Sequence, residues 1–250
     1  RRIELGKPMT ATAITLLAAH LLGDFVLQTD RMVERKRSPW VLLLHVVIVA
    51  GLSAALLGAV PPALMAVLFL SHLAMDALKV FALPSGASAF LADQAVHLAV
   101  IAGLAVAFPD AALSGVWAAS LGDAYSAYLQ VLAVAIGLLL AVPAGGVMIG
   151  LLLRPLTAEL DAEMGPGNGL THGGRYIGWL ERALTLLLFL AGQASAVGFV
   201  IATKSILRFG EIKDSKHRKL AEYIIIGTFL SFAWAIVCGL LTQRMLTALS

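Results

Sequence analysis

The sequence predicts an all-α fold, a polytopic transmembrane helical bundle of about seven membrane segments, from its composition and from the length of its apolar segments. Hydrophobic residues make up 60% of the 250 residues and charged residues only 13%, whereas soluble domains carry about a quarter charged residues. The mean hydropathy of +0.90 agrees with this. Each apolar segment is long enough to cross roughly 30 Å of hydrocarbon at about 1.5 Å per residue. The segments are residues 10–29, 40–60, 62–83, 90–108, 122–153, 177–203 and 221–246.

The chain divides into three parts. Residues 1–9 are expected to be a leader or an expression remnant, because Met9 opens the first apolar run. Residues 10–110 form a four-helix membrane domain whose segments are separated by proline-containing turns, since proline interrupts helices. Residues 111–250 hold the remaining membrane helices and a basic cytoplasmic loop at 204–219.

Basic residues gather in two short segments, 31–37 and 204–219, as they do in the cytoplasmic loops of membrane proteins. This placement predicts a topology signal and no nucleic-acid site. Five apolar segments separate the two, and an odd number of crossings would put them on opposite sides of the membrane. One segment is therefore misassigned, and 122–153, where two glycines follow soon after Pro143, is expected to turn back or cross twice. The single cysteine, Cys238, excludes an intramolecular disulfide.

Four of the six histidines lie in the first four apolar segments, and three of them have an aspartate four residues away. Four residues is about one helical turn, so each pair shares one face and can close on a common ion. If the segments alternate in direction, all seven side chains fall within roughly 15 Å of the cytoplasmic face. Ionisable groups at membrane depth are costly unless they compensate one another or bind an ion. The seven candidate metal ligands are His20, Asp24, His45, His72, Asp76, Asp93 and His97.

This ligand set predicts a divalent cation, because imidazole and carboxylate without thiolate suit zinc, manganese, iron or nickel, with zinc as the first choice. A hydrolytic site follows: Asp24 or Asp76 accepts the proton of an activated water, and Lys79 stabilises the developing anion. Gln28 and Gln94 are supporting residues. Two alternatives use the same side chains, a proton or ion pathway and a purely structural network. Lys79 also has an alternative, as an interface lysine that reaches the headgroups.

The first half of the chain contains motifs that resemble a known family. They are His20-Leu-Leu-Gly-Asp24-Phe-Val-Leu-Gln28, the lone His45, His72-Leu-Ala-Met-Asp76-Ala-Leu-Lys79 and Asp93-Gln94-Ala-Val-His97. Over roughly residues 10–110 they resemble an uncharacterised bacterial integral-membrane family, domain of unknown function 3307, which carries no established activity. The chain is more distantly similar to predicted membrane-bound metal-dependent hydrolases, which also place histidine and aspartate on short transmembrane helices. The resemblance implies a metal but no particular reaction or substrate.

Charged residues border the last two apolar segments and predict a polar rim at headgroup level. Lys204 and Arg208 are four residues apart, so both project from one helical face and could hold a lipid phosphate. The alternative is an ion-pair network between the glutamates and the basic residues. The rim residues are Arg175, Glu181, Arg182, Lys204, Arg208 and Glu222.

These features predict a multi-pass protein of the bacterial inner membrane. The leading functional hypothesis is a metal-dependent hydrolase that acts on a lipid-borne or amphipathic substrate near the cytoplasmic face. The rival hypotheses are a proton- or ion-coupled transporter and a non-catalytic membrane scaffold or sensor. Membrane lipids are the expected partners and nucleic acid is not, while the sequence leaves the oligomeric state open.

Overall fold

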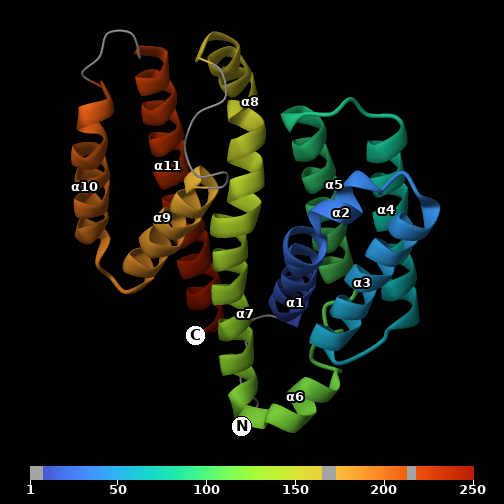
Figure 1. Cartoon of the computed structure of the whole chain (residues 1–250). Coiled ribbons are helices and arrows are strands. Elements are labelled where there is room, and N and C mark those ends of the chain that lie inside the picture. Colours follow the sequence, from blue (N-terminus) through green and yellow to red (C-terminus); the bar gives the residue numbers. More distant parts are fainter. Residues whose placement is uncertain (1–7, 165–172, 213–217) are drawn as a thin grey trace. The chain divides into compact units, whose positions relative to one another are not determined.

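The chain holds helices and no strand wherever the computed structural model describes it, at residues 8–164, 173–212 and 218–250. Side chains are described there except at 161–164, 205, 207–212 and 218. This confirms the all-α prediction, with η1 and η3 as π-helical turns and η2 as a short 3-10 turn. The elements, drawn in Figure 1, are α1 (Pro8–Leu22), η1 (Gly23–Leu27), α2 (Asp30–Glu34), α3 (Pro39–Leu57), α4 (Pro62–Phe81), α5 (Ala87–Ala107), α6 (Val116–Leu121), η2 (Gly122–Ala124), α7 (Tyr125–Leu139), η3 (Leu140–Ala144), α8 (Gly145–Met164), α9 (Gly173–Leu190), α10 (Ala194–Ile212) and α11 (Arg218–Leu249).

Six stretches within the described residues are long and apolar enough to cross a membrane, which confirms a polytopic bundle with six candidate spans where about seven were expected. The first four agree with the predicted segments to within three residues at either end. Pro39 and Pro62 are the first residues of α3 and α4, a position where the missing N–H of proline costs nothing. The spans are Pro8–Leu27, Pro39–Leu57, Pro62–Phe81, Ala87–Ala107, Val116–Leu160 and Lys219–Leu249.

The predicted leader and the first helix overlap slightly. α1 begins at Pro8, so Pro8 and Met9 are helical. Residues 1–7 lie outside the described residues.

The prediction of one membrane span at 177–203 is wrong, because the chain turns back within it. α9 ends just before Gly192, which has a left-handed conformation with a φ of 73°. Gln193 N–H donates to Leu188 O at 2.8 Å, and Gly192 N–H donates to Phe189 O at 3.1 Å. Two such bonds around a left-handed glycine form a Schellman motif, which ends a helix. α9 and α10 therefore form a hairpin that runs back from this turn (Figure 1).

The expectation that 122–153 turns back or crosses twice is also wrong, since these residues lie in one continuous helical stretch, Val116–Leu160. Pro143 does not end this helix but lies in the wider turn η3. Proline lacks an N–H, and its ring pushes away the carbonyl four residues earlier, so a π-helical turn accommodates it. The carbonyls freed in this way need donors from elsewhere.

The described chain forms two compact units. The first comprises Arg1–Leu139 and Arg244–Ser250. Within it α1 packs against α3, α5 and α7, and α4 packs against both α3 and α5. The span that contains α1 is accordingly the most buried of the six candidate spans found among the described residues. The predicted domain boundary after residue 110 remains a prediction, because a compact unit need not coincide with a folding domain.

The second unit comprises Leu140–Gln243. Within it α9 packs against η3, α8 and α10. This packing brings polar side chains of α9 to the π-helical turn around Pro143.

Candidate metal centre

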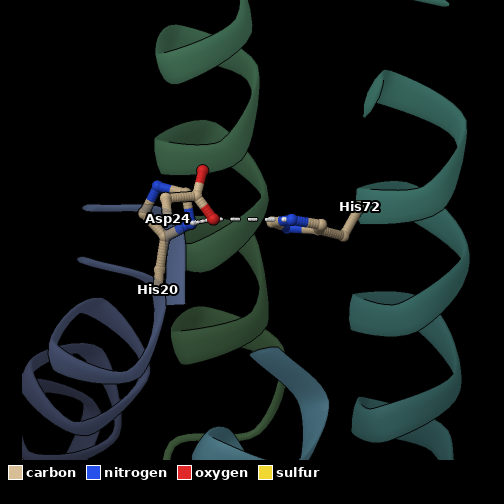
Figure 2. A group of neighbouring side chains, drawn as sticks. All are labelled: His20, Asp24 and His72. Carbon is tan, nitrogen blue, oxygen red and sulfur yellow. Dashed lines mark ion pairs between the residues drawn. The ribbon is translucent and has the colours of Figure 1, made fainter. Parts of the chain in front are cut away.

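The seven predicted ligands converge at one end of the first unit. The shared face of each four-residue pair is directed inward, and the exposed fraction of these side chains is at most 6%. Figure 2 shows the Asp24 side chain directed toward His72, with His20 beside it. The ligands come from four parts of the bundle: His20 and Asp24 from α1 and η1, His45 from α3, His72 and Asp76 from α4, and Asp93 and His97 from α5.

Four ligand atoms form a compact group. His45 Nε2 lies 3.1 Å from His72 Nε2. Asp24 Oδ1 lies 3.3 Å and 3.6 Å from these two nitrogens, and Asp76 Oδ2 lies 3.4 Å and 3.5 Å from them. Ligands of a tetrahedral zinc ion, with bonds of about 2.0–2.2 Å, are separated by about 3.3–3.6 Å. The spacing of the four atoms therefore fits one four-coordinate ion.

Each of the three carboxylates has one oxygen held by donors and one oxygen with no hydrogen-bond partner in the described part of the chain. Lys36 Nζ donates to Asp76 Oδ1 at 2.9 Å, and Gln94 Nε2 donates to Asp24 Oδ2 at 3.5 Å and to Asp93 Oδ2 at 3.1 Å. A buried acceptor without a donor costs free energy. Metal-binding carboxylates are characteristically hydrogen-bonded through outer residues in this way. The unpartnered oxygens are Asp24 Oδ1, Asp76 Oδ2 and Asp93 Oδ1.

Two of the histidines have the protonation pattern of metal ligands. His97 Nδ1 donates to the Asp93 carbonyl oxygen at 2.9 Å, so its Nε2 carries the lone pair, and that atom has no partner among the described residues. Gln94 uses its amide N–H groups on two carboxylates, so its Oε1 accepts from His20 Nε2 at 3.2 Å. This leaves the lone pair on His20 Nδ1, which lies 3.7 Å from Asp24 Oδ1. A neutral imidazole whose other N–H is held by an acceptor is the form that binds metals.

Lys36 is the functional-site residue that sequence reasoning misses, because the basic first loop reads only as a topology signal. Thr29 caps α2 by accepting a hydrogen bond from Met32 N–H at 3.3 Å. The chain then turns, with Ser38 N–H donating to Arg35 O at 2.9 Å, and the Lys36 side chain is buried beside the cluster while Arg35 is exposed. No local spacing connects Lys36 with an aspartate forty positions away.

Lys79 and Gln28 differ in their relation to the ligands. Lys79 Nζ lies 2.5 Å from Asp93 Oδ2, and its side chain is 29% exposed, so the ion pair lies at the accessible edge of the cluster. Gln28 has a buried Nε2 without a hydrogen-bond partner in the described part of the chain, and no described contact joins it to the ligands. The roles of both residues remain predictions.

The predicted rim residues of the C-terminal half occupy different environments. Lys204 Nζ lies 2.6 Å from Glu181 Oε2, and both side chains are largely buried. Arg175 lies over two neighbouring aromatic rings. Glu222 lines a pocket between α8 and α11, and the Arg208 side chain lies outside the described residues.

Arg182 is not at a rim, because its side chain is buried against η3. Its Nε donates to Ala141 O at 2.7 Å, its Nη2 to Val142 O at 3.2 Å and its Nη1 to Ser231 Oγ at 3.3 Å. Trp234 Nε1 donates to Leu140 O at 2.8 Å. Burial lowers the pKa of the Arg182 guanidinium, and the adjacent Glu181 carboxylate opposes this shift. The carbonyls freed by the π-helical turn thus have donors from α9 and α11.

Comparison with known proteins connects the cluster to a family without a known activity. Residues 12–119 match a family model described as "Protein of unknown function (DUF3307)". No curated protein and no solved structure matches the chain. The more distant similarity to membrane-bound hydrolases therefore remains a prediction. The part of the chain that carries all seven candidate ligands is similar to this family of proteins of unknown function.

Proposed function

We propose that this membrane protein binds a divalent cation, with zinc as the first choice, and uses it as a hydrolase. The cation is held by Asp24, His45, His72 and Asp76. The substrate is lipid-borne or amphipathic, and the site lies near the cytoplasmic face of a bacterial inner membrane. The single observation that carries this proposal is the set of unpartnered carboxylate oxygens that faces two imidazole nitrogens.

The charges of the cluster support a cation. Three buried carboxylates are accompanied by two ammonium groups, those of Lys36 and Lys79, so negative charge is in excess when the imidazoles are neutral. Moving uncompensated charge into a low-dielectric interior is costly. A divalent cation among the oxygens and nitrogens removes this excess and supplies the missing partners at once.

The surrounding residues can support hydrolysis. A divalent ion supplies Lewis-acid polarisation and lowers the pKa of a water molecule. Asp24 has one oxygen oriented by Gln94 and the other directed into the centre, so it is placed to accept a proton there. Lys79 is the accessible cation of the cluster and is placed to stabilise negative charge that develops on a substrate.

The setting of the site favours a substrate with apolar groups. The four helices that carry the ligands are candidate membrane spans, and the large side chains around the cluster end of the unit are exposed, among them Val26, Trp40, Leu78 and Phe81. Exposed tryptophan and aliphatic side chains at helix ends are typical of the membrane interface. A molecule that reaches the cluster therefore passes apolar surface.

A relay through the bilayer receives less support. Toward the other ends of these helices the buried polar side chains among the described residues are hydroxyls, those of Thr12, Thr15 and Ser53. Each donates to a backbone carbonyl. A proton or ion pathway would need titratable groups or water along that length.

Metal content tests the first part of the proposal. The wild-type protein, purified in detergent and measured by inductively coupled plasma mass spectrometry, should retain bound zinc, and the double variant His45→Ala, His72→Ala should retain much less. Ser71→Ala is the matched control, since it lies beside His72 but removes no ligand. Equal zinc in the wild-type protein and the double variant would contradict the proposed site.

Hydrolysis of two probe esters tests the second part. The zinc-loaded protein in mixed micelles should hydrolyse p-nitrophenyl phosphate or p-nitrophenyl butyrate. A chelator should abolish the activity, added zinc should restore it, and the double variant should lack it. A protein that binds zinc but hydrolyses neither probe would contradict the hydrolase proposal while leaving the metal site intact.

A further inference from the structure

We propose that Asp76, Asp93 and His97 form a second cation position beside the first, so that the cluster is a two-cation centre. This inference rests on the proposed function, because the first position supplies one of the shared ligands. It assigns a role to two buried ligands that a single ion between α1, α3 and α4 does not reach.

Two ligand atoms remain unpartnered after the first position has been filled. Asp93 Oδ1 and His97 Nε2 have no hydrogen-bond partner among the described residues, although Asp93 and His97 are only 1% and 4% exposed. Leaving a buried polar atom unpaired costs about 1–3 kcal/mol, and more for a charged group. The first group of ligands, with its oxygens from Asp24 and Asp76, satisfies neither atom.

The remaining ligands are close enough to share one ion. Asp76, Asp93 and His97 each offer a ligand atom within 4.8 Å of the other two. The other oxygen of Asp93 is held by Lys79 and Gln94, which fixes the carboxylate. This is the same division between a held oxygen and an unpartnered oxygen that characterises the first position.

The two positions are adjacent. Asp76 belongs to both ligand groups, and the ring centroids of His72 and His97 are 4.2 Å apart. In two-metal hydrolytic sites the ions lie about 3.5–4 Å apart and share ligands. Asp76 is the residue placed to be shared here.

A buried water is the competing occupant for the second position. His20, His72 and His97 line a small cavity with the hydroxyl-bearing Ser53 and Ser71. A water there would satisfy a histidine nitrogen but would leave the Asp93 carboxylate without a cation on its inner side. The competing occupants differ in the number of ions that one chain binds.

Zinc titration of the chelator-treated full-length protein in detergent tests the inference. The wild-type protein should bind two zinc ions per chain, and His97→Ala should bind one. Val96→Ala is the matched control, because it removes an exposed side chain from the same helix, and it should bind two. Circular dichroism and size-exclusion chromatography check that each variant is folded.

Manganese provides a second readout that does not depend on catalysis. Two Mn²⁺ ions at the separation of a two-metal site are spin-coupled, so the wild-type protein should give a coupled electron paramagnetic resonance spectrum, whereas His97→Ala should give the spectrum of isolated Mn²⁺. One ion per chain in both proteins, without coupling, would overturn the second position and leave the proposed function standing. Loss of all metal from folded His97→Ala would also overturn it, since His97 would then belong to a single centre. A wild-type protein that binds no metal would contradict the proposed function itself.

Discussion

Lys36 Nζ lies 2.9 Å from Asp76 Oδ1, and this ion pair is buried although forty positions separate the two residues. Removing one partner of a buried pair leaves the other charge uncompensated, which costs about 3–5 kcal/mol. Lys36→Met should therefore lower the free energy of unfolding by an amount in this range. The measurement is unfolding of the metal-free protein in mixed micelles, followed by circular dichroism.

Arg37→Met is the control for the Lys36 variant. It removes one positive charge from the same loop, but Arg37 is exposed, and exposed charges contribute little to stability. If both variants lose the same stability, the effect comes from the net charge of the loop and the buried pair is unimportant.

Gly23 allows α1 and α3 to approach closely just before Asp24. A Cβ atom on Gly23 would lie 2.6 Å from Val49 Cγ2, and forced overpacking of this kind costs about 1–3 kcal/mol. Gly23→Ala should therefore destabilise the protein and weaken zinc binding by displacing Asp24. Unfolding in mixed micelles and zinc titration are the two measurements.

A second substitution on the facing helix tests the cause of the Gly23 effect. Gly23→Ala combined with Val49→Ala should lose less stability than the sum of the two single variants, because the smaller side chain makes room for the new methyl group. Gly51→Ala is the control, since a Cβ atom there would meet nothing within 4 Å. Additive losses would show that crowding against Val49 is not the reason.

The ligand cluster could be predicted from the sequence because two of its determinants are local. A four-residue spacing puts His72 and Asp76 on one helical face whatever surrounds the helix, and the length of each apolar run limits the depth of its polar residues. Which carboxylate oxygen faces which imidazole depends on packing between helices. That information, including the central position of His45, is not contained in any single segment.

Two features of the molecule could not be predicted by the same means. The contact of Lys36 with the cluster depends on a loop conformation, whereas the basic composition of that loop indicates only its side of the membrane. The end of α9 depends on local hydrogen bonds around Gly192. Apolar residues on both sides keep the average hydropathy of 177–203 high, so a reading based on apolar length passes over the glycine that ends the helix.

The hairpin of α9 and α10 predicts that both of its open ends lie on the same side of the membrane. With 177–203 removed as a crossing, four candidate spans among the described residues separate the basic segments 31–37 and 204–219 along the chain. An even number agrees with two cytoplasmic basic segments. Arg175→Cys and Ile206→Cys, each in a Cys238→Ala background, should therefore react with a membrane-impermeant maleimide from the same side of sealed vesicles.

A pair of positions across a candidate span provides the control for the labelling. Trp40→Cys and Val60→Cys replace exposed side chains near the two ends of the span Pro39–Leu57, so they should react from opposite sides. Reaction of the Arg175 and Ile206 variants from opposite sides, in vesicles where this control behaves as expected, would show that the α9 and α10 segment crosses the membrane.

Arg182 is expected to stabilise the helix at Pro143 by binding the carbonyl oxygens of Ala141 and Val142. Each buried carbonyl left without a donor costs about 1–3 kcal/mol, so Arg182→Met should lower the free energy of unfolding in mixed micelles by at least that amount. Pro143→Ala restores a backbone N–H and lets the turn return to α-helical hydrogen bonding. In the Pro143→Ala background the Arg182→Met substitution should therefore cost clearly less, and Arg175→Met, on an exposed side chain of the same helix, should cost little in either background. An equal cost of Arg182→Met with and without Pro143 would mean that the guanidinium stabilises the unit through Ser231 or through packing, and that the freed carbonyls are not what it serves.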